Sequence, residues 1–448
     1  MSDVASAGPT TSHGGADGLR REFTLRSTFS LAFAFISPII ALYTIFALSL
    51  QASGPAFWWG FVVVLAGQLL VAFVLAELAS ACPLAGGLYQ WSRRLVGNTY
   101  GWFAAWAYLA TLVVIATATA YAAAPFLAEL IGANAESNWT LVLLSLVVLA
   151  AATLANMIGR GVLKVFITLS IAAELIGSVV IGTVLLLFYR VNSIGVIFDN
   201  FGTTEGLYIA GPFLTGVAFI GWAFVGFDAA TDVAEECNEP ERSVPKAVVY
   251  SLLGVAAIVM YAGLALILAI PDLEGAVAGN GGDPIIATLS THLGAAVAKP
   301  LFAIIVVGFT AGIVAIQAAL SRLVFALSRD RLLPAVDFLG RLSEGERLPL
   351  NAILAGGAVS ASLLAVSFSD SAYGAFIGTA TVGFYVAFAF PVFAALYARR
   401  RGALRFGPYS LGRYGGAVTT AAAVWLVFEI VNIAWPRGAC GARSRWSC

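Results

Sequence analysis

One apolar run ends in a cluster of acidic residues, and these are the residues of the chain best suited to bind a proton or a cation. Residues 213–236 read FLTGVAFIGWAFVGFDAATDVAEE, in which Gly226 is followed by Asp228, Asp232 and Glu236 at helical spacing. A charged side chain at the middle of a bilayer costs about 2.5 to 3.5 kcal/mol on insertion scales. We therefore predict that a membrane helix is interrupted around Gly226 and that its loosened backbone faces a wet cavity.

An interruption at Val225-Gly226-Phe227 would free backbone carbonyl groups to accept hydrogen bonds from an ammonium group. Phe224 and Phe227 are candidates for the apolar or cation–π walls of such a site. Trp222 lies one turn before the break and is a candidate gate. The alternative is that these aromatic side chains belong to the packed core or face lipid.

Asp228 and Asp232 lie one helical turn apart and share one face of the helix. They are candidates for holding a proton or a cation, and a salt bridge to another helix explains them equally well. Glu236 lies at the expected cytoplasmic end of the run. Pairing with Arg242, Arg322 or Arg329 there would make it an inner gate or a helix cap.

A second interruption is predicted at Ser37-Pro38, within LAFAFISPIIALYTIF. Proline lacks an N–H group and clashes with the preceding turn, so the helix must kink or open there. An opened segment frees N–H groups, and the N-terminus of a half-helix adds positive potential. Ser37, Pro38 and Ile39 are therefore candidates for binding a carboxylate. A simple proline kink is the alternative, and pairing with the Gly226 break favours the open form.

Two further carboxylates lie in apolar runs. Glu174, in LSIAAELIGS, is near the centre of its run and is the most isolated ionisable group in the sequence. It is a candidate coupling-proton site or a ligand for a cationic substrate, and a bond to a neighbouring helix is the alternative. Glu77, in AELASACPLAGGLYQWSRRL, is expected to pair with a basic residue as a gate or structural tie. Pro83 is expected to end that helix, with Arg93 in the following loop.

Composition places the chain in a membrane. Of its 448 residues, 60% are hydrophobic and 11% are charged, whereas soluble domains carry about 25% charged residues. The net charge is zero, which gives no reason to expect a nucleic-acid partner. The four cysteines lack the spacing of metal ligands, and no nucleotide-binding or catalytic motif is present. The sequence therefore predicts a polytopic helical protein in a lipid bilayer that is not an enzyme and needs no metal or cofactor.

Apolar runs long enough to cross a bilayer number about eleven. They lie near residues 27–50, 58–82, 100–131, 139–157, 162–190, 211–236, 246–270, 298–327, 349–368, 371–397 and 414–435. Most Lys and Arg residues fall on the side of the N-terminus if that end is cytoplasmic. Residues 1–26 are expected to form a disordered cytoplasmic tail. Residues 436–448 have an atypical composition, which indicates either a truncated or altered chain end or a short genuine tail.

The two interruptions occupy corresponding places in two halves of the chain. Each lies near the middle of its run, and five runs separate them, so the halves would have opposite topology. This pattern predicts a transport core at 27–397, with one repeat near 27–190 and the other near 211–397. Residues 398–435 would then form a loop and a peripheral eleventh helix.

Several of these stretches resemble the amino acid–polyamine–organocation superfamily of secondary transporters. AELASACPLAGGLYQW resembles its helix 2 signature, and GFDAATDVAEECNEPERSVPKA resembles its helix 6 signature and following loop. ALSRDRLLP resembles a motif after helix 8. FGPYSLGRYGGAV is similar to the amino acid/choline transporter branch, which includes permeases for 4-aminobutyrate, choline and basic amino acids.

The resemblance implies a five-plus-five inverted repeat that works by alternating access, with broken helices 1 and 6. It places the carboxylate of the ligand at residues 37–39 and its amino group at residues 224–227. Helices 1, 2, 6 and 7 would move against helices 3, 4, 8 and 9. The chain departs from typical members because a glycine-rich helix 1 break is replaced by Ile36-Ser37-Pro38-Ile39. Some relatives have a lysine in helix 5 that replaces a sodium ion; this chain has Glu174 in that helix, without an alignment to the lysine.

The expectation is a permease for an amino acid or related amine in a bacterial inner membrane, coupled to protons or working by exchange. A choline- or polyamine-type organic cation transporter is the nearest alternative. Aromatic residues around the site, together with extra carboxylates facing it, would favour the second. A channel would need a continuous polar pore, and a receptor or membrane enzyme would need an added domain or catalytic set.

Overall fold

The structure is a computed structural model, and it describes residues 24–84, 86–201, 208–343, 348–365 and 372–435. Nearly all of the N-terminal tail predicted at 1–26 and the whole atypical segment 436–448 lie outside the described residues. The secondary structure of the described part is helical, as the apolar runs predict.

The first half of the chain forms the first five membrane-crossing units. Its elements are α1 (Leu25–Ile36), α2 (Pro38–Tyr43), α3 (Phe46–Ser53), α4 (Trp58–Ala81), α5 (Gly87–Leu95), α6 (Asn98–Ile131), α7 (Asn138–Ile158), α8 (Arg160–Glu174), the π-helical segment η2 (Leu175–Val180) and α9 (Ile181–Phe188). Both α1–α2 and α8–η2–α9 are single apolar runs in the sequence that the backbone divides into shorter pieces.

The second half begins with helix 6, which is the most subdivided unit. Its elements are η4 (Ile209–Phe213), α10 (Leu214–Ile220), η5 (Gly221–Phe224), α11 (Ala229–Asp232), η6 (Ala234–Glu236), α12 (Pro240–Ala269), α13 (Leu273–Val277), α14 (Pro284–Arg329), α15 (Val336–Leu339), α16 (Leu350–Leu363), α17 (Ala372–Arg400) and α18 (Gly415–Ala434). Helix 8 is longer than its apolar run predicts, because α14 begins at Pro284 and kinks at Gly294.

Ten helical units of the described part are long and apolar enough to cross a membrane. The ninth of the eleven predicted runs, 349–368, forms the shorter helix α16, which has 14 residues. The end of that run, 366–368, lies outside the described residues. The polytopic membrane architecture predicted from hydropathy is confirmed.

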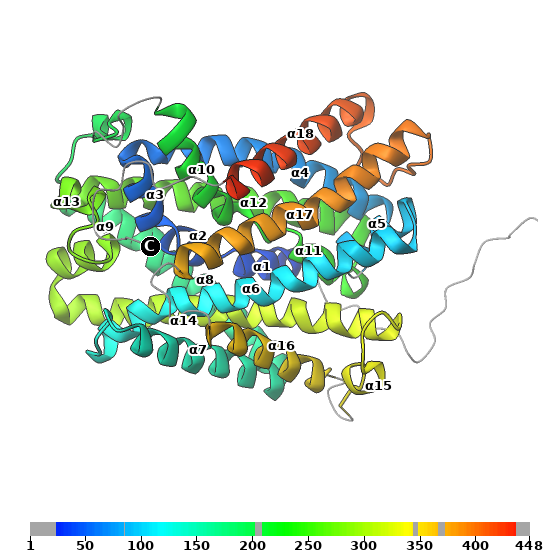
Figure 1. Cartoon of the computed structure of the whole chain (residues 1–448), viewed down its shortest axis with the longest axis horizontal. Helices are drawn as coiled ribbons and strands as arrows, with labels where there is room; N and C mark the ends of the chain where they lie inside the picture. Colours follow the sequence, from blue (N-terminus) through cyan, green and yellow to red (C-terminus); the bar gives the residue numbers. More distant parts are fainter. Residues whose placement is uncertain (1–23, 85, 202–207, 344–347, 366–371, 436–448) are drawn as a thin grey trace, which may run out of the picture.

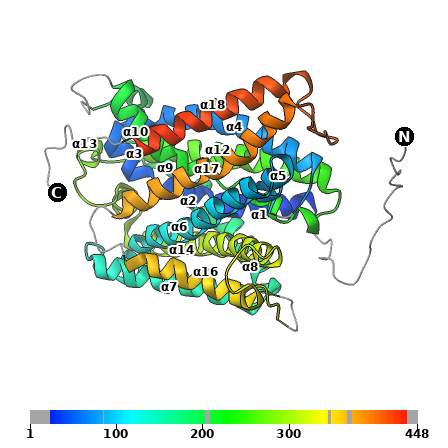
Figure 2. The ribbon, with the colours of Figure 1, turned by 45° about the vertical axis from the view of Figure 1, so that its right-hand side comes forward.

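The helices form two packed groups that meet along the middle of the molecule (Figure 1). In one group α6 and α14 lie against each other and carry α7 and α16 on their outer side, as Figure 2 also shows. In the other, α4 and α1 pack on α12, with α10 against α4 and α11 against α1. Helices α17 and α18 pack against each other, α17 also on α6 and α18 also on α4. This grouping brings the two divided helices, 1 and 6, together.

The segment after helix 2 corrects one expectation. The sequence predicts Arg93 in a loop, but residues 87–95 form α5, which packs on α6 and α17. Gly86 starts it in a left-handed conformation (φ 72°), which glycine adopts without a steric penalty. Leu88 and Trp91 are buried on one side of α5 while its two arginines fall on the other. This amphipathic pattern explains a short helix lying outside the membrane-crossing units.

Candidate functional site

The break in helix 1 lies at Ser37, as the Ser-Pro pair predicts. Ser37 has φ 49° and ψ 109°, a conformation that ends α1, and Pro38 then occupies the first turn of α2. Proline is suited to that position because its missing N–H would have no helical partner. The Ser37 hydroxyl oxygen accepts a hydrogen bond from the N–H of Ile40 (3.1 Å) and so caps α2.

Glu174 reaches across from helix 5 into this break. The N–H of Ile39 donates to Glu174 Oε2 at 2.7 Å, and the Ser37 hydroxyl donates to Glu174 Oε1. The N–H of Ser37 donates to Phe33 O (2.9 Å) and that of Ala41 to Ser37 O (2.7 Å). Every N–H group from Ser37 to Ala41 therefore has an acceptor within the protein.

Two glycines and a π-helical segment allow helix 5 to come so close. A Cβ added at Gly177 would lie 2.7 Å from Ile39 Cδ1, and one at Gly308 would lie 2.8 Å from the same atom. Gly177 belongs to η2, and its carbonyl oxygen accepts a hydrogen bond from the Tyr43 hydroxyl. Segments of π-helix often mark functional sites. Here the segment begins right after Glu174 and ties the second half of helix 1 to helix 5.

The break in helix 6 lies at Val225-Gly226, as predicted. The 3₁₀ segment η5 ends at Phe224, Val225 is extended, and Gly226 has φ 91°, which side chains rarely allow. The Phe35 ring covers Gly226, because an added Cβ there would lie 2.5 Å from that ring. Trp222 Nε1 donates to the carbonyl oxygen of Ile40 at 3.3 Å. The two breaks are thus in direct contact.

Aromatic rings surround the helix 6 break and are all buried. Phe224 packs edge-on against Phe61 of α4, with ring centroids 6.0 Å apart. Phe227 packs against Phe388 of α17 at 5.1 Å. Both sequence alternatives, core residue and site wall, remain compatible with this packing, and the wall role stays a prediction.

Beyond the break, the acidic residues of helix 6 form a buried polar cluster. Asp228 is fully buried and faces the hydroxyl of Tyr108 on α6. Within the described residues, neither carboxylate oxygen of Asp228 makes a hydrogen bond of standard geometry. The same holds for the hydroxyls of Tyr108 and Thr231 and for Asp232 Oδ2. Buried polar atoms without partners are costly and rare in proteins, so this cluster has unused acceptor capacity.

Glu236 and Glu77, the two carboxylates nearest the helix ends, are engaged in ion pairs. Glu236 lies 3.7 Å from Arg322 of α14, one of the partners expected from the sequence. Glu77 pairs with Arg399 at the end of α17. The first pair joins helix 6 to helix 8, and the second joins helix 2 to helix 10.

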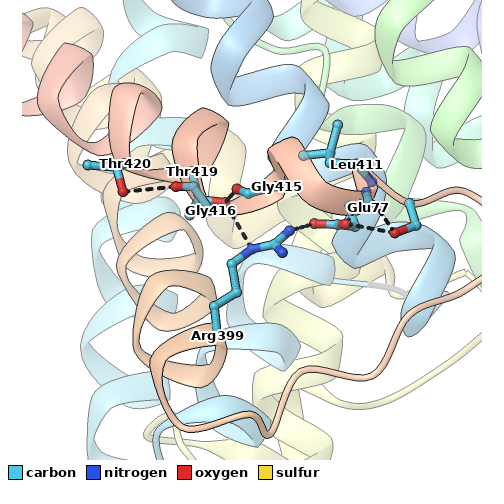
Figure 3. A network of polar contacts seen from close by, with 9 residues as sticks. Glu77, Arg399, Leu411, Gly415, Gly416, Thr419 and Thr420 are labelled. Carbon is cyan, nitrogen blue, oxygen red and sulfur yellow. Dashed lines mark hydrogen bonds and ion pairs between the residues drawn. The ribbon is translucent and has the colours of Figure 1, made fainter.

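The Glu77 pair is the centre of a wider network (Figure 3). Glu77 Oε1 accepts the N–H of Leu411 at 2.9 Å, and Arg399 Nε donates to the Thr419 hydroxyl at 3.1 Å. Gly415 leaves room for the guanidinium, since an added Cβ there would lie 2.4 Å from Nη1. The network fastens α17, the following loop and α18 to α4, which indicates a structural tie for Glu77.

Sequence reasoning missed several residues of this region. Tyr108 and Phe35 carry no signal of their own, because aromatic residues are common in membrane helices. Thr231 lies between the two aspartates, one turn after Asp228, and its helical spacing was a usable signal. Arg399 is one of three consecutive arginines at the end of its apolar run, and nothing in that run singles it out as the partner of Glu77. None of the predicted site residues lies outside the described part.

An all-helical membrane protein in which two interrupted helices meet beside buried carboxylates has the architecture of a secondary transporter. Residues 27–445 match the Amino acid permease family, and the chain belongs to that family. It is thus a membrane permease and not an enzyme, as its similarity to known permeases also indicates.

Three relatives illustrate the range of the family. The chain is 27% identical over 443 residues to amino-acid permease 2 of Neurospora crassa, covering 93% of this chain and 79% of that protein. It is 24% identical to amino-acid permease BAT1 of Arabidopsis thaliana, covering 93% and 86%. It is also 24% identical to the choline transporter of Saccharomyces cerevisiae, covering 97% and 79%.

Proposed function

We propose that this permease moves an amino acid or a related amine across a membrane by alternating access. The observation that carries the proposal is the direct contact of the two helix breaks, through Trp222 on Ile40 and Phe35 on Gly226. Broken helices paired in this way form the substrate site in many secondary transporters.

The buried polar cluster of helix 6 suggests which residues bind the substrate and which act as gates. Asp228 is proposed to bind the ammonium group of the substrate, because both of its oxygens lack a standard hydrogen bond in the described part. Phe224 and Phe227 would wall the site and Trp222 would gate it from helix 1. Asp232 and the Glu236–Arg322 pair lie further along helix 6, where they would act as an inner gate.

The energy source is proposed to be a proton gradient or exchange of one solute for another. Glu174 and Asp228 are the proposed proton carriers, because both are fully buried carboxyl groups in membrane-crossing units. Glu174→Gln should then make uptake independent of the proton gradient. Undiminished dependence in that variant would remove Glu174 from the coupling mechanism.

The orientation is proposed from basic residues, which place the N-terminus in the cytoplasm. Arg93 of α5 and Arg322 of α14 would lie on the same cytoplasmic side. The bacterial inner membrane stays a prediction from the sequence, and the three relatives described above come from a fungus, a plant and a yeast.

An organic cation is the second candidate substrate, and one specific observation favours it. The helix 1 break, where an amino acid would place its carboxylate, already holds the carboxylate of Glu174. The similarity to a choline transporter agrees with this candidate.

Purified protein in proteoliposomes provides the test. We expect saturable uptake of a radiolabelled amino acid or amine, driven by an imposed proton gradient or by substrate loaded inside. Empty liposomes are the control for leakage. Specific binding without uptake under both conditions would contradict transport and point to a receptor.

A further inference from the structure

The helix 1 break has no N–H group left to bind a ligand. From Ser37 to Ala41 every N–H is paired, and Pro38 has none. Glu174 holds the Ile39 N–H at 2.7 Å and also accepts from the Ser37 hydroxyl. A substrate carboxylate would have to displace a buried carboxyl group of the protein that already occupies both donors.

The helix 6 side has the opposite property, because its spare groups are acceptors. Both oxygens of Asp228 and Oδ2 of Asp232 have no hydrogen bond of standard geometry among the described residues, and the Tyr108 hydroxyl is the polar group that faces Asp228. An ammonium group with three N–H donors satisfies such a set, whereas a quaternary ammonium group offers no N–H donor. Aromatic rings around the cluster add cation–π attraction to any positive charge that enters.

Taken together, these observations lead us to infer that Glu174 is a specificity-determining residue that excludes substrates carrying a carboxylate next to the ammonium group. The substrate class is then a protonated primary amine without an α-carboxylate, such as a diamine or an amino acid whose carboxylate lies several carbons away. Glu174 supplies from within the protein the carboxyl group that an α-amino acid would bring to the helix 1 break. This inference rests on the proposed function, since it names the substrate of the same site.

The test uses pairs of compounds that differ only by the α-carboxylate. These are 1,4-diaminobutane with ornithine, 1,5-diaminopentane with lysine, and 4-aminobutyrate with glutamate. Equilibrium binding of each radiolabelled compound to the full chain in nanodiscs gives an affinity ratio for each pair. Choline is included to separate primary from quaternary ammonium groups.

We expect wild-type protein to bind at least one compound without the α-carboxylate about tenfold or more tightly than its partner, and more tightly than choline. In Glu174→Ala the Ile39 N–H and the Ser37 hydroxyl lose their acceptor. The ratio for that pair should then fall by about tenfold or more, because an α-carboxylate can bind them. Glu174→Gln keeps an acceptor oxygen but no charge and should give an intermediate ratio.

Two results would overturn the inference. One is a wild-type preference for the α-amino acid or for choline in these comparisons. The other is an unchanged ratio in Glu174→Ala, or in Glu174→Gln should the alanine variant fail to fold. Either leaves the proposed permease function standing, since binding still occurs. Absence of binding for all of these compounds would also overturn the inference, whereas the proposed function is tested separately by uptake of other amino acids into proteoliposomes.

Discussion

The two helix breaks in this permease differ in how completely the protein satisfies them. At Ser37 each freed N–H has a partner, and Glu174 fills the gap from helix 5. Near Gly226 the neighbouring Asp228 is buried with both oxygens lacking a standard partner in the described part. A break whose N–H groups are all paired within the protein connects two helices. A break beside unpaired carboxylate oxygens can still bind a ligand. A broken helix is therefore not enough to indicate a binding site. The site is indicated by buried polar groups near the break that have no hydrogen-bond partner in the protein.

A similar contrast separates two buried carboxylates of the same bundle. Glu77 has a cation, a backbone N–H and a hydroxyl as partners. Asp228 has only the nearby Tyr108 hydroxyl. Removing the charge of a paired group should harm folding, and removing that of an unpaired group should harm function.

Glu77→Gln should cause the largest loss of stability. Glu77 and Arg399 have side chains only 2% and 11% exposed, so the variant leaves a nearly buried guanidinium without its counter-charge. Breaking such a pair costs about 3 to 5 kcal/mol. Thermal unfolding in detergent measures the effect, and Glu136→Gln in an exposed turn is the control. A melting temperature equal to that of the control would show that the network is not a structural tie.

Gly226→Ala should destabilise the protein and impair uptake together. A non-glycine residue at φ 91° costs about 1 to 3 kcal/mol, and the new Cβ would also meet the Phe35 ring at 2.5 Å. Gly378→Ala is the matched control, because that glycine is helical and an added Cβ there has no atom within 4 Å. Uptake and melting temperature that match the control would mean that helix 6 does not need its break.

Asp228→Asn should reduce substrate uptake by about tenfold or more, which corresponds to about 1.4 kcal/mol. The melting temperature should stay the same or rise, because the variant removes a buried charge that has no ionic partner. Asp337→Asn, on the exposed face of α15, is the control for expression and reconstitution. Unaltered uptake kinetics would remove Asp228 from the site.

Cys237 should react slowly with N-ethylmaleimide, and the rate should increase as the pH rises. It lies just beyond the acidic end of helix 6, is fully buried and contacts the Thr28 hydroxyl at 3.0 Å. Burial raises the pKa of the Cys237 thiol, so less of the reactive thiolate is present at neutral pH.

Labelling is measured by mass spectrometry in a variant that keeps only Cys82 and Cys237. The partly exposed Cys82 serves as the internal control. Equal rates at pH 7 for the two thiols would show that the end of helix 6 is open rather than packed on helix 1.

Much of this architecture is readable from local chemistry. Ser37-Pro38 and Gly226 predicted both breaks because proline and glycine act on their own turn of the chain. Hydropathy predicted ten of the membrane-crossing units for the same reason, with errors in their bounds, in α5 and in the ninth run, which forms the shorter α16. Glu174 stands out in the sequence alone, because it is the one carboxyl group near the centre of its apolar run.

The residues that these side chains contact in the fold could not be predicted from the sequence. Glu174 can reach the helix 1 break because Gly177 and Gly308 leave room for Ile39. This contact depends on how three helices pack together. Tyr108 faces Asp228 only because the fold brings this residue of α6 to the end of the helix 6 break. Contacts between residues far apart in the sequence leave no periodic pattern in a single chain, so the distinction between the two breaks required the fold.

A structure determined by electron cryo-microscopy with 1,4-diaminobutane bound would test the central claim most directly. We expect an ammonium group within hydrogen-bonding distance of Asp228, while Glu174 keeps its hydrogen bond from the Ile39 N–H. A ligand seated on the Ile39 N–H with Glu174 displaced, or helices 1 and 6 running on without interruption, would contradict it.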